Sequence, residues 1–273
     1  MEVAGNRKAL ERTVSPGIAE IGGKNALKLS LLTWNMQGKD SKDPDKMGNK
    51  MSALKNWLFS GAVENPVICL QECGKLDEFK QLRPISPKSS VSAGDIRFSS
   101  RQVMFVVYYE AEVDNNRTNL AIVTRADLAT GNVETILPPP RQSGLRSVVG
   151  MEIDRTGGLY IYSQHAPSSN PKFASKYTRL MLPKIRKSQW IYAGDFNCEP
   201  SELDQGKGDW QQDWIVTAGS EQTQISGGKL DYVVSRNILS TAGNEIHWIR
   251  EIPGKADNFA SDHYVQYFEV TLK

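Results

Sequence analysis

LKLSLLTWN, residues 27–35, is a β-rich, largely apolar run that ends in a polar side chain, Asn35. The same pattern recurs in PVICLQE, residues 66–72, which ends in Glu72. Runs of about four to eight such residues, bounded by turn formers, are typical of β-strands. Both segments therefore predict strands that carry a polar group at one end.

Similar runs along the chain predict a sheet-dominated core. The nine expected strands are Leu27–Leu32, Pro66–Leu70, Val103–Tyr109, Leu120–Val123, Val148–Ile153, Leu159–Tyr162, Trp190–Ala193, Leu230–Val234 and Tyr264–Leu272. Loops are expected over residues 41–49 and 84–94, which are rich in turn formers.

Two segments predict helices. Residues 51–60 place apolar side chains at helical spacing before a glycine, and residues 170–182 begin with an Asn-Pro pair that is typical of a helix start. In the second helix we expect Phe173, Tyr177 and Leu180 to face the core. Many strands with few helices predict an α/β or α+β fold, in which two packed mixed sheets have helices outside.

The amino-acid composition is that of a globular protein. The chain has 273 residues, 39% apolar and 23% charged, with a formal net charge of +2, which is ordinary for a globular protein and unlike a disordered chain. A nucleic-acid ligand is allowed but not required by this charge. No stretch has the roughly 18 apolar residues of a transmembrane helix. We expect one domain over residues 27–273.

Residues 1–26 are expected to form a flexible N-terminal extension, because glycine and proline interrupt a polar stretch. This segment lacks the apolar core of a secretory signal. The three cysteines, Cys69, Cys73 and Cys198, cannot all pair within one molecule and are expected to be buried. For Cys198, which follows Asn197, a reactive thiol near the functional site is the alternative.

We expect polar side chains to follow directly after several of the apolar, strand-forming runs. They are Asn35, Glu72, His165, Asp195, Asn197, Asp231, Asp262 and His263. Each has a plain structural explanation when it is taken singly, such as a capped turn or a surface acid. Together, polar groups at the ends of several strands are how layered β folds assemble a site from distant parts of the chain.

The residue types fit metal-assisted cleavage of a phosphate ester. Such cleavage needs an activated water, a cation for the developing negative charge and a proton for the leaving oxygen. Glu72 and Asp262, with the amide of Asn35, form a plausible Mg²⁺ site. His165 and His263 can transfer protons or stabilise the phosphate oxygens.

The remaining residues have expected supporting tasks. Asp231 can accept a hydrogen bond from His263 and fix its tautomer. Asp195 and Asn197 flank Phe196 and can hold the water and a phosphate oxygen. These roles make hydrolysis of a phosphodiester the first hypothesis.

Five ordered motifs resemble those of the endonuclease/exonuclease/phosphatase superfamily. They are TWNMQG at 33–38, LQE at 70–72, GDFN at 194–197, LDY at 230–232 and SDH at 261–263. The resemblance covers about residues 27–272. It implies the fold of deoxyribonuclease I, a four-layered α/β sandwich with a divalent-metal site for Mg²⁺, or for Mn²⁺ or Ca²⁺, at the strand ends.

Other segments resemble the branch formed by the catalytic components of cytolethal distending toxins. They are WNMQG at 34–38, RTNLAIV at 117–123, and LPPP at 137–140 followed by Arg146. This resemblance implies a nuclease that nicks double-stranded DNA with low sequence specificity, with Arg117 and Arg146 contacting phosphates. It also implies secretion, delivery subunits as partners and action in a target-cell nucleus, although this chain shows no export signal.

Two other functions remain open. A phosphoinositide phosphatase of the same superfamily can use the same metal, histidines and basic groups. An abasic-site repair endonuclease would share most of the metal site, but its branch tends to place tyrosine where this chain has His165.

Overall fold

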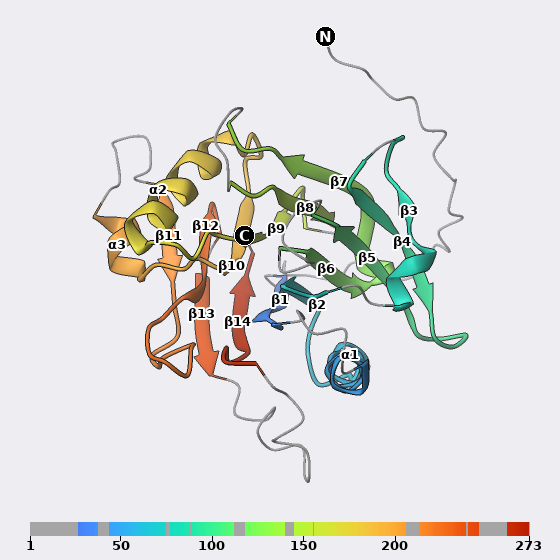
Figure 1. Ribbon diagram of the computed structural model, residues 1–273. Coiled ribbons are helices and arrows are strands. Elements are labelled where there is room, and N and C mark those ends of the chain that lie inside the picture. The colour runs from blue at the N-terminus through green and yellow to red at the C-terminus, as the bar shows by residue number, and fades with distance from the viewer. Residues whose placement is uncertain are drawn as a thin grey trace.

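The computed structural model describes residues 27–37, 44–74, 77–87, 89–111, 118–139, 145–154, 156–205, 213–238, 240–245 and 261–272. In these parts of the chain, strands form two sheets, with helices on either side of the pair (Figure 1). The extension expected over residues 1–26 lies outside them. None of the helices described is long and apolar enough to cross a membrane.

The larger sheet has eight strands. In spatial order they are β13 (Ser240–Glu245), β14 (Gln266–Thr271), β1 (Lys28–Asn35), β2 (Pro66–Gln71), β6 (Leu120–Arg125), β5 (Val103–Tyr109), β4 (Val91–Arg97) and β3 (Arg83–Pro84). β1 and β2 are parallel, and β14 runs antiparallel to β1.

The smaller sheet has six strands. In spatial order they are β11 (Trp214–Thr217), β12 (Asp231–Arg236), β10 (Trp190–Asp195), β9 (Tyr160–His165), β8 (Val148–Ile153) and β7 (Ala129–Ile136). β9 and β10 are parallel, and β12 runs antiparallel to β10. The helices are α1 (Pro44–Phe59), α2 (Pro171–Met181) and α3 (Pro200–Asp204), with 3₁₀ turns at Asp77–Gln81, Ala126–Leu128 and Leu182–Lys184.

Three apolar layers hold the elements together, and β1 shows why. Successive side chains of a strand point to opposite faces. Leu29 and Leu31 pack between the two sheets, whereas Leu32 and Trp34 pack with α1 on the outer face of the larger sheet. α2 and α3 cover the outer face of the smaller sheet in the same way. The order helix, sheet, sheet, helix confirms the expected four-layered α/β sandwich.

The nine predicted strands are present, but the expected loops were partly wrong. Residues 84–94 include the start of β4, which the sequence conceals because Gly94 and Asp95 are poor strand formers. Pairing along β5 supplies the hydrogen bonds that hold β4 in place. The loop expected over residues 41–49 overlaps the first turn of α1, which begins at Pro44.

The second predicted helix is confirmed as α2, and the Asn170 side chain caps it by accepting a hydrogen bond from the Lys172 amide. Its expected core face was wrong for Phe173 and Leu180, which are exposed. The buried face is shifted around the helix, and its members are Ala174, Ser175, Tyr177, Thr178 and Met181.

All three cysteines are buried free thiols. Burial raises the pKa of Cys198 to about 11, and its Sγ lies 3.5 Å from the Tyr232 hydroxyl. Since the thiolate is the reactive form of cysteine, these surroundings favour a packing role for Cys198 over a reactive thiol.

Candidate active site

The site lies at one edge of the two sheets, where strands of both directions contribute residues. β1, β2, β9 and β10 end there, whereas β12 begins there with Asp231 and β14 follows Asp262 and His263. The sequence suggested that these three residues follow a strand, and this was wrong. Because β12 and β14 are antiparallel to their neighbours, their beginnings lie beside the other strands' ends.

In the smaller sheet, strand register places three of these side chains in a row. Asp195 of β10 pairs with His165 of β9 on one side and with Asp231 of β12 on the other. Residues that pair directly across neighbouring strands share a face of the sheet. All three are at most 3% exposed. The backbone thus brings two carboxylates and an imidazole together away from bulk water.

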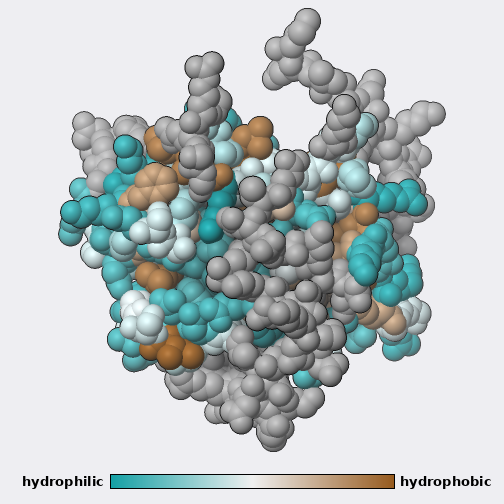
Figure 2. Space-filling model, in the orientation of Figure 1, coloured by the Kyte–Doolittle hydropathy of each residue, from teal (hydrophilic) through white to brown (hydrophobic). Residues whose placement is uncertain are grey.

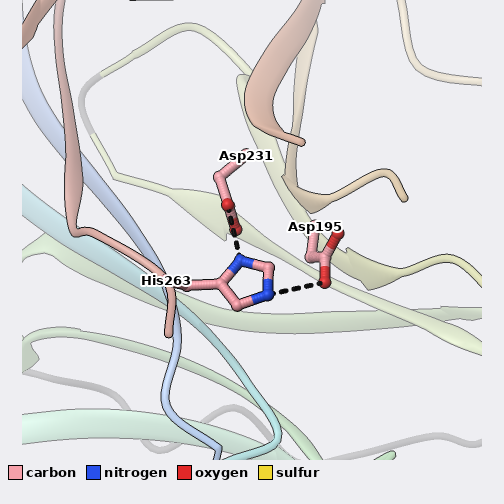
Figure 3. Close-up of side chains that lie close together, drawn as sticks. All are labelled: Asp195, Asp231 and His263. Atoms are coloured by element: carbon pink, nitrogen blue, oxygen red, sulfur yellow. Dashed lines mark hydrogen bonds and ion pairs between the residues drawn. The ribbon is translucent and has the colours of Figure 1, made fainter. Parts of the chain in front are cut away.

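His263 lies between the two carboxylates of this row (Figure 3). Its Nδ1 is 2.7 Å from Asp231 Oδ2, and its Nε2 is 3.8 Å from Asp195 Oδ2. Burial lowers the pKa of His263, but Asp231, Asp195 and Asp262 outweigh burial and raise it to about 9. Asp231 therefore holds the imidazole with Nδ1 as donor and Nε2 toward the site.

Asp195 Oδ2 is the atom on which the site converges. Asn35 Nδ2 donates to it at 3.0 Å across the gap between the sheets, and His165 Nε2 lies 3.5 Å away. Burial and the negative charge of Asp231 raise the pKa of Asp195 to about 7, against the opposing effect of His263 and two hydrogen bonds. A carboxyl group with such a pKa can exchange a proton near neutral pH.

Glu72 is the second carboxylate of this centre. Its Oε1 accepts from Asn35 Nδ2 at 3.3 Å and lies 3.6 Å from His165 Nε2. Three site-edge residues have a positive φ, namely Gln37 at 46°, Glu72 at 47° and Asn197 at 49°. Non-glycine residues seldom adopt this conformation, because it is strained and persists only where the surrounding structure holds it in place. Such residues are found most often at functional sites.

The donor set fits a divalent cation. Glu72 and Asp195 supply carboxylate oxygens around Asn35, and such hard oxygens are preferred by Mg²⁺. Asp262 Oδ1 accepts no hydrogen bond from the described residues, although His263 Nε2 lies 3.6 Å away. The loop of Asp262 is tied to that of Asn35, because the Asp262 amide donates to Gln37 Oε1 at 2.9 Å.

Another group of possible ligands is Asp195, Asp231 and His263, whose ligand atoms lie within 4.8 Å of one another. A cation there would compete with the hydrogen bond between Asp231 and His263 Nδ1. The carboxylate oxygens of Glu72 and its neighbours therefore fit a cation better. Asn35, expected as a neutral oxygen ligand, turns its Nδ2 toward these carboxylates, and its Oδ1 accepts from the Gln37 amide at 3.0 Å.

Asn197 and Arg146 both hold the chain that follows β9. Asn197 Nδ2 donates to the Ala166 carbonyl at 2.8 Å, and Arg146 Nη1 donates to the same carbonyl at 3.1 Å and to the His165 carbonyl at 3.5 Å. Phosphate contacts by Asn197 and Arg146 remain predictions. Arg117 lies outside the described residues.

The structure adds Gln224, which the sequence did not indicate. Its Nε2 lies 3.4 Å from Asp262 Oδ2 and 3.5 Å from His263 Nε2. Gln224 belongs to a turn before β12 and adjoins no predicted strand, so it lacks the strand-end signal of the other residues. Only tertiary contacts reveal it.

Comparisons with known proteins agree with this architecture. A profile described as Endonuclease/Exonuclease/phosphatase family matches residues 32–263. A curated relative from Salmonella typhi, a homolog of the B subunit of cytolethal distending toxin, is 27% identical over 88% of this chain and 88% of its own length.

Two crystal structures are similar to this chain in fold. One is the cytolethal distending toxin of Actinobacillus actinomycetemcomitans, with a TM-score of 0.68 and 22% identity over 88% of this chain and 97% of that one. The other is the Haemophilus ducreyi cytolethal distending toxin, with a TM-score of 0.69 and 20% identity over 89% of this chain and 98% of that one.

Proposed function

Because this chain belongs to the endonuclease/exonuclease/phosphatase family, we propose that it is a divalent-metal-dependent phosphodiesterase that nicks double-stranded DNA with little sequence specificity. The observation that carries the proposal is the convergence of Asn35, His165 and His263 on Asp195 Oδ2, at 3.0, 3.5 and 3.8 Å. This arrangement combines proton exchange, oxyanion binding and metal ligation in one buried place.

Each group has a task in in-line hydrolysis. Asp195 accepts a proton from the attacking water, since its pKa of about 7 lets it bind and release protons at neutral pH. The water oxygen forms the new P–O bond while the P–O bond to the leaving oxygen breaks, and His263, held at Nδ1 by Asp231, gives that leaving oxygen a proton. His165 donates to a phosphate oxygen as negative charge develops. Bound Mg²⁺, held by the carboxylates of Glu72 and Asp262 beside Asn35, would neutralise that charge.

DNA is favoured as the substrate by the resemblance of residues 34–38, 117–123 and 137–140 to the cytolethal distending toxin branch, which implies a nuclease. The curated relative is itself named as a homolog of a component of such a toxin. Arg146 lies beside the candidate active site, because its guanidinium donates hydrogen bonds to the carbonyls of residues 165 and 166. An Arg in that place can add a sequence-independent phosphate contact, which makes cleavage sensitive to salt.

The test compares two substrates. Purified protein should convert supercoiled plasmid to the open-circular form with Mg²⁺, stop in EDTA, and release little phosphate from phosphatidylinositol trisphosphate. His165→Ala should lower the nicking rate at least about 100-fold, because it removes a group that contacts both carboxylates.

An exposed control, Asp127→Asn, should keep the wild-type rate, since its side chain is 56% exposed and pairs with Arg125 at the surface. If the protein releases phosphate from phosphatidylinositol trisphosphate but does not nick plasmid, it is a phosphoinositide phosphatase and the proposed nuclease activity is wrong. If neither substrate reacts and His165→Ala behaves like wild type, the catalytic proposal is wrong.

A further inference from the structure

The turn at Thr223–Gly228 is fixed to the catalytic edge by its backbone. The Ile225 amide donates to the Asp262 carbonyl and the Tyr264 amide to the Thr223 carbonyl, both at 2.8 Å. These bonds pair Gln224 with His263 as an antiparallel bridge. The turn is therefore held on both sides of His263, at a fixed position relative to the reacting groups.

The other end of the turn is fixed to Asp231. Thr223 Oγ1 accepts from the Leu230 amide at 2.8 Å and from the Asp231 amide at 3.0 Å. The Thr223 amide donates to the Gly228 carbonyl at 2.8 Å, which closes the turn on itself. A turn bound in this way to both partners of the Asp231–His263 pair is rigid enough to position its side chains.

Its two central side chains have different surroundings. Gln224 lies against Asp262 and His263, within 3.5 Å of His263 Nε2, the nitrogen that Asp231 does not hold. Ile225, the next residue, is 63% exposed. Gln224 pairs with His263, whereas Ile225 is the first central residue of the β-turn that the Gly227 amide closes by donating to the Gln224 carbonyl at 3.0 Å, so one side chain lies in the site and the other at its rim.

We propose that this turn is a substrate-contacting element in which Gln224 donates to an oxygen of the scissile phosphate and Ile225 packs on the sugar and base of an adjoining nucleotide. The inference rests on the proposed nuclease function. A neutral amide suits the first task, because it can donate to a phosphate oxygen without adding negative charge beside Asp262. An anchored apolar side chain suits the second, because flanking nucleotides extend past the phosphate on the protein surface.

A nucleotide is favoured over a membrane by the surroundings of Ile225. Its polar neighbours in and beside the turn are Gln222, Ser226 and Lys229, whereas membrane-binding protein surfaces present several apolar side chains together. On the face drawn in Figure 2, hydrophobic atoms of the described residues form small separate groups rather than one continuous patch. One isoleucine can cover one nucleotide step but is a poor lipid anchor.

The experiment measures kcat/KM for plasmid nicking and for bis(p-nitrophenyl) phosphate, a small diester without flanking nucleotides. Gln224→Ala should lower both values about 10- to 100-fold, the range for losing one hydrogen bond to a charged group. Ile225→Ser should lower the ratio of plasmid to small-diester activity about three- to tenfold, as expected for part of a buried Ile contact. It should also weaken binding of a short fluorescent DNA duplex in EDTA.

The matched control is Ile215→Ser, at another exposed isoleucine, 51% exposed on β11. It should leave both activities and duplex binding unchanged, and thermal melting should show that all three variants fold. The proposal is overturned if Ile225→Ser and Ile215→Ser have the same ratio of plasmid to small-diester activity. It is also overturned if Gln224→Ala leaves kcat/KM for both substrates unchanged. If Ile225→Ser impairs only phosphoinositide hydrolysis, the occupant is a lipid and the nucleotide assignment is wrong. Wild-type protein that cleaves neither diester would instead refute the proposed function itself.

Discussion

Asp195 shows how much one residue depends on its neighbours in this site. Its carboxylate is 1% exposed, accepts from Asn35 through Oδ2 and from the Asn197 amide through Oδ1, and faces both site histidines. A buried carboxylate without partners would stay protonated. Here the opposing effects bring the Asp195 pKa to about 7, so the group is poised between its two protonation states at physiological pH.

The pair Asp231 and His263 gives the first residue-scale prediction. Asp231→Asn should lower the hydrolysis rate about 100-fold, because the amide neither fixes the His263 tautomer nor stabilises its protonated form. The pKa of His263, followed by NMR of its ring protons, should fall in the same variant. A normal rate with an unchanged His263 pKa would show that Asp231 only packs.

A second prediction concerns the stability of the metal-free protein. In the folded state the pKa of Asp195 is raised from 3.8 to about 7 and that of His263 from 6.5 to about 9. A raised pKa means that the folded state binds the proton more tightly than the unfolded chain. The resulting stability is therefore complete at low pH and is lost as pH rises through the folded-state value.

In EDTA, the melting temperature should fall by at least about 3 °C between about pH 6 and about pH 9.5. Mg²⁺ replaces protons at the carboxylates, so its stabilising effect should be larger at pH 8 than at pH 6. Asp195→Asn should flatten the curve below about pH 7, because the contribution of Asp195 is lost between its unfolded-state pKa of 3.8 and its folded-state pKa of about 7. A metal-free melting temperature that rises with pH would contradict the assignment.

At the scale of elements, β9 and β10 must approach closely for the site to form. Gly194 precedes Asp195 and has a φ of 148°, and a Cβ built there would lie 2.0 Å from the Gln164 carbonyl oxygen. Backbone cannot move away as a flexible side chain can. Glycine at this position lets the two parallel strands stay in register up to His165 and Asp195.

Gly194→Ala should therefore lower the free energy of unfolding by more than about 2 kcal/mol, because both sterics and backbone strain oppose it. Chemical denaturation measures the loss. Gly131→Ala is the matched control, since Gly131 also has a positive φ, 85°, but has nothing within 4 Å of its built Cβ. Equal losses in the two variants would show that the close approach to Gln164 has no energetic consequence.

At the scale of the whole molecule, buried polar contacts between the sheets fix how the two halves of the site meet. Gln71 Nε2 donates to Ser163 Oγ at 3.2 Å, and Ser163 Oγ donates to the Leu70 carbonyl at 3.2 Å, which joins β2 of the larger sheet to β9 of the smaller one. Within the larger sheet, Gln71 Oε1 accepts from Thr33 Oγ1 at 3.3 Å. All three side chains are fully buried. Hydrophobic burial is non-directional, whereas such hydrogen bonds require specific distances and angles and so favour one alignment of the sheets.

Gln71→Ala should lower the free energy of unfolding by about 2 to 4 kcal/mol, because it leaves buried partners unsatisfied. It should also weaken Mg²⁺ binding, measured by calorimetry, since Gln71 precedes Glu72 at the end of β2. Gln189→Ala, which removes a surface hydrogen bond to the Asn237 carbonyl, should change neither quantity. A loss of stability with unaltered Mg²⁺ affinity would confine Gln71 to a structural role.

Nine of the core strands, the layered fold and the candidate residues at the strand ends could be predicted from the sequence. Apolar runs and the polar residues next to them are local signals, which can be recognised from neighbouring positions in the chain. It did not reveal the other strands that the structure describes, β3, β4, β7, β11 and β13, each of which is held by pairing with a neighbouring strand. Nor did it reveal the buried face of α2, which depends on the sheet it covers. The convergence on Asp195 and the presence of Gln224 were decided by tertiary structure alone. Those contacts join residues that lie far apart in the chain, so their distances depend on sheet register and on the packing of one sheet against the other.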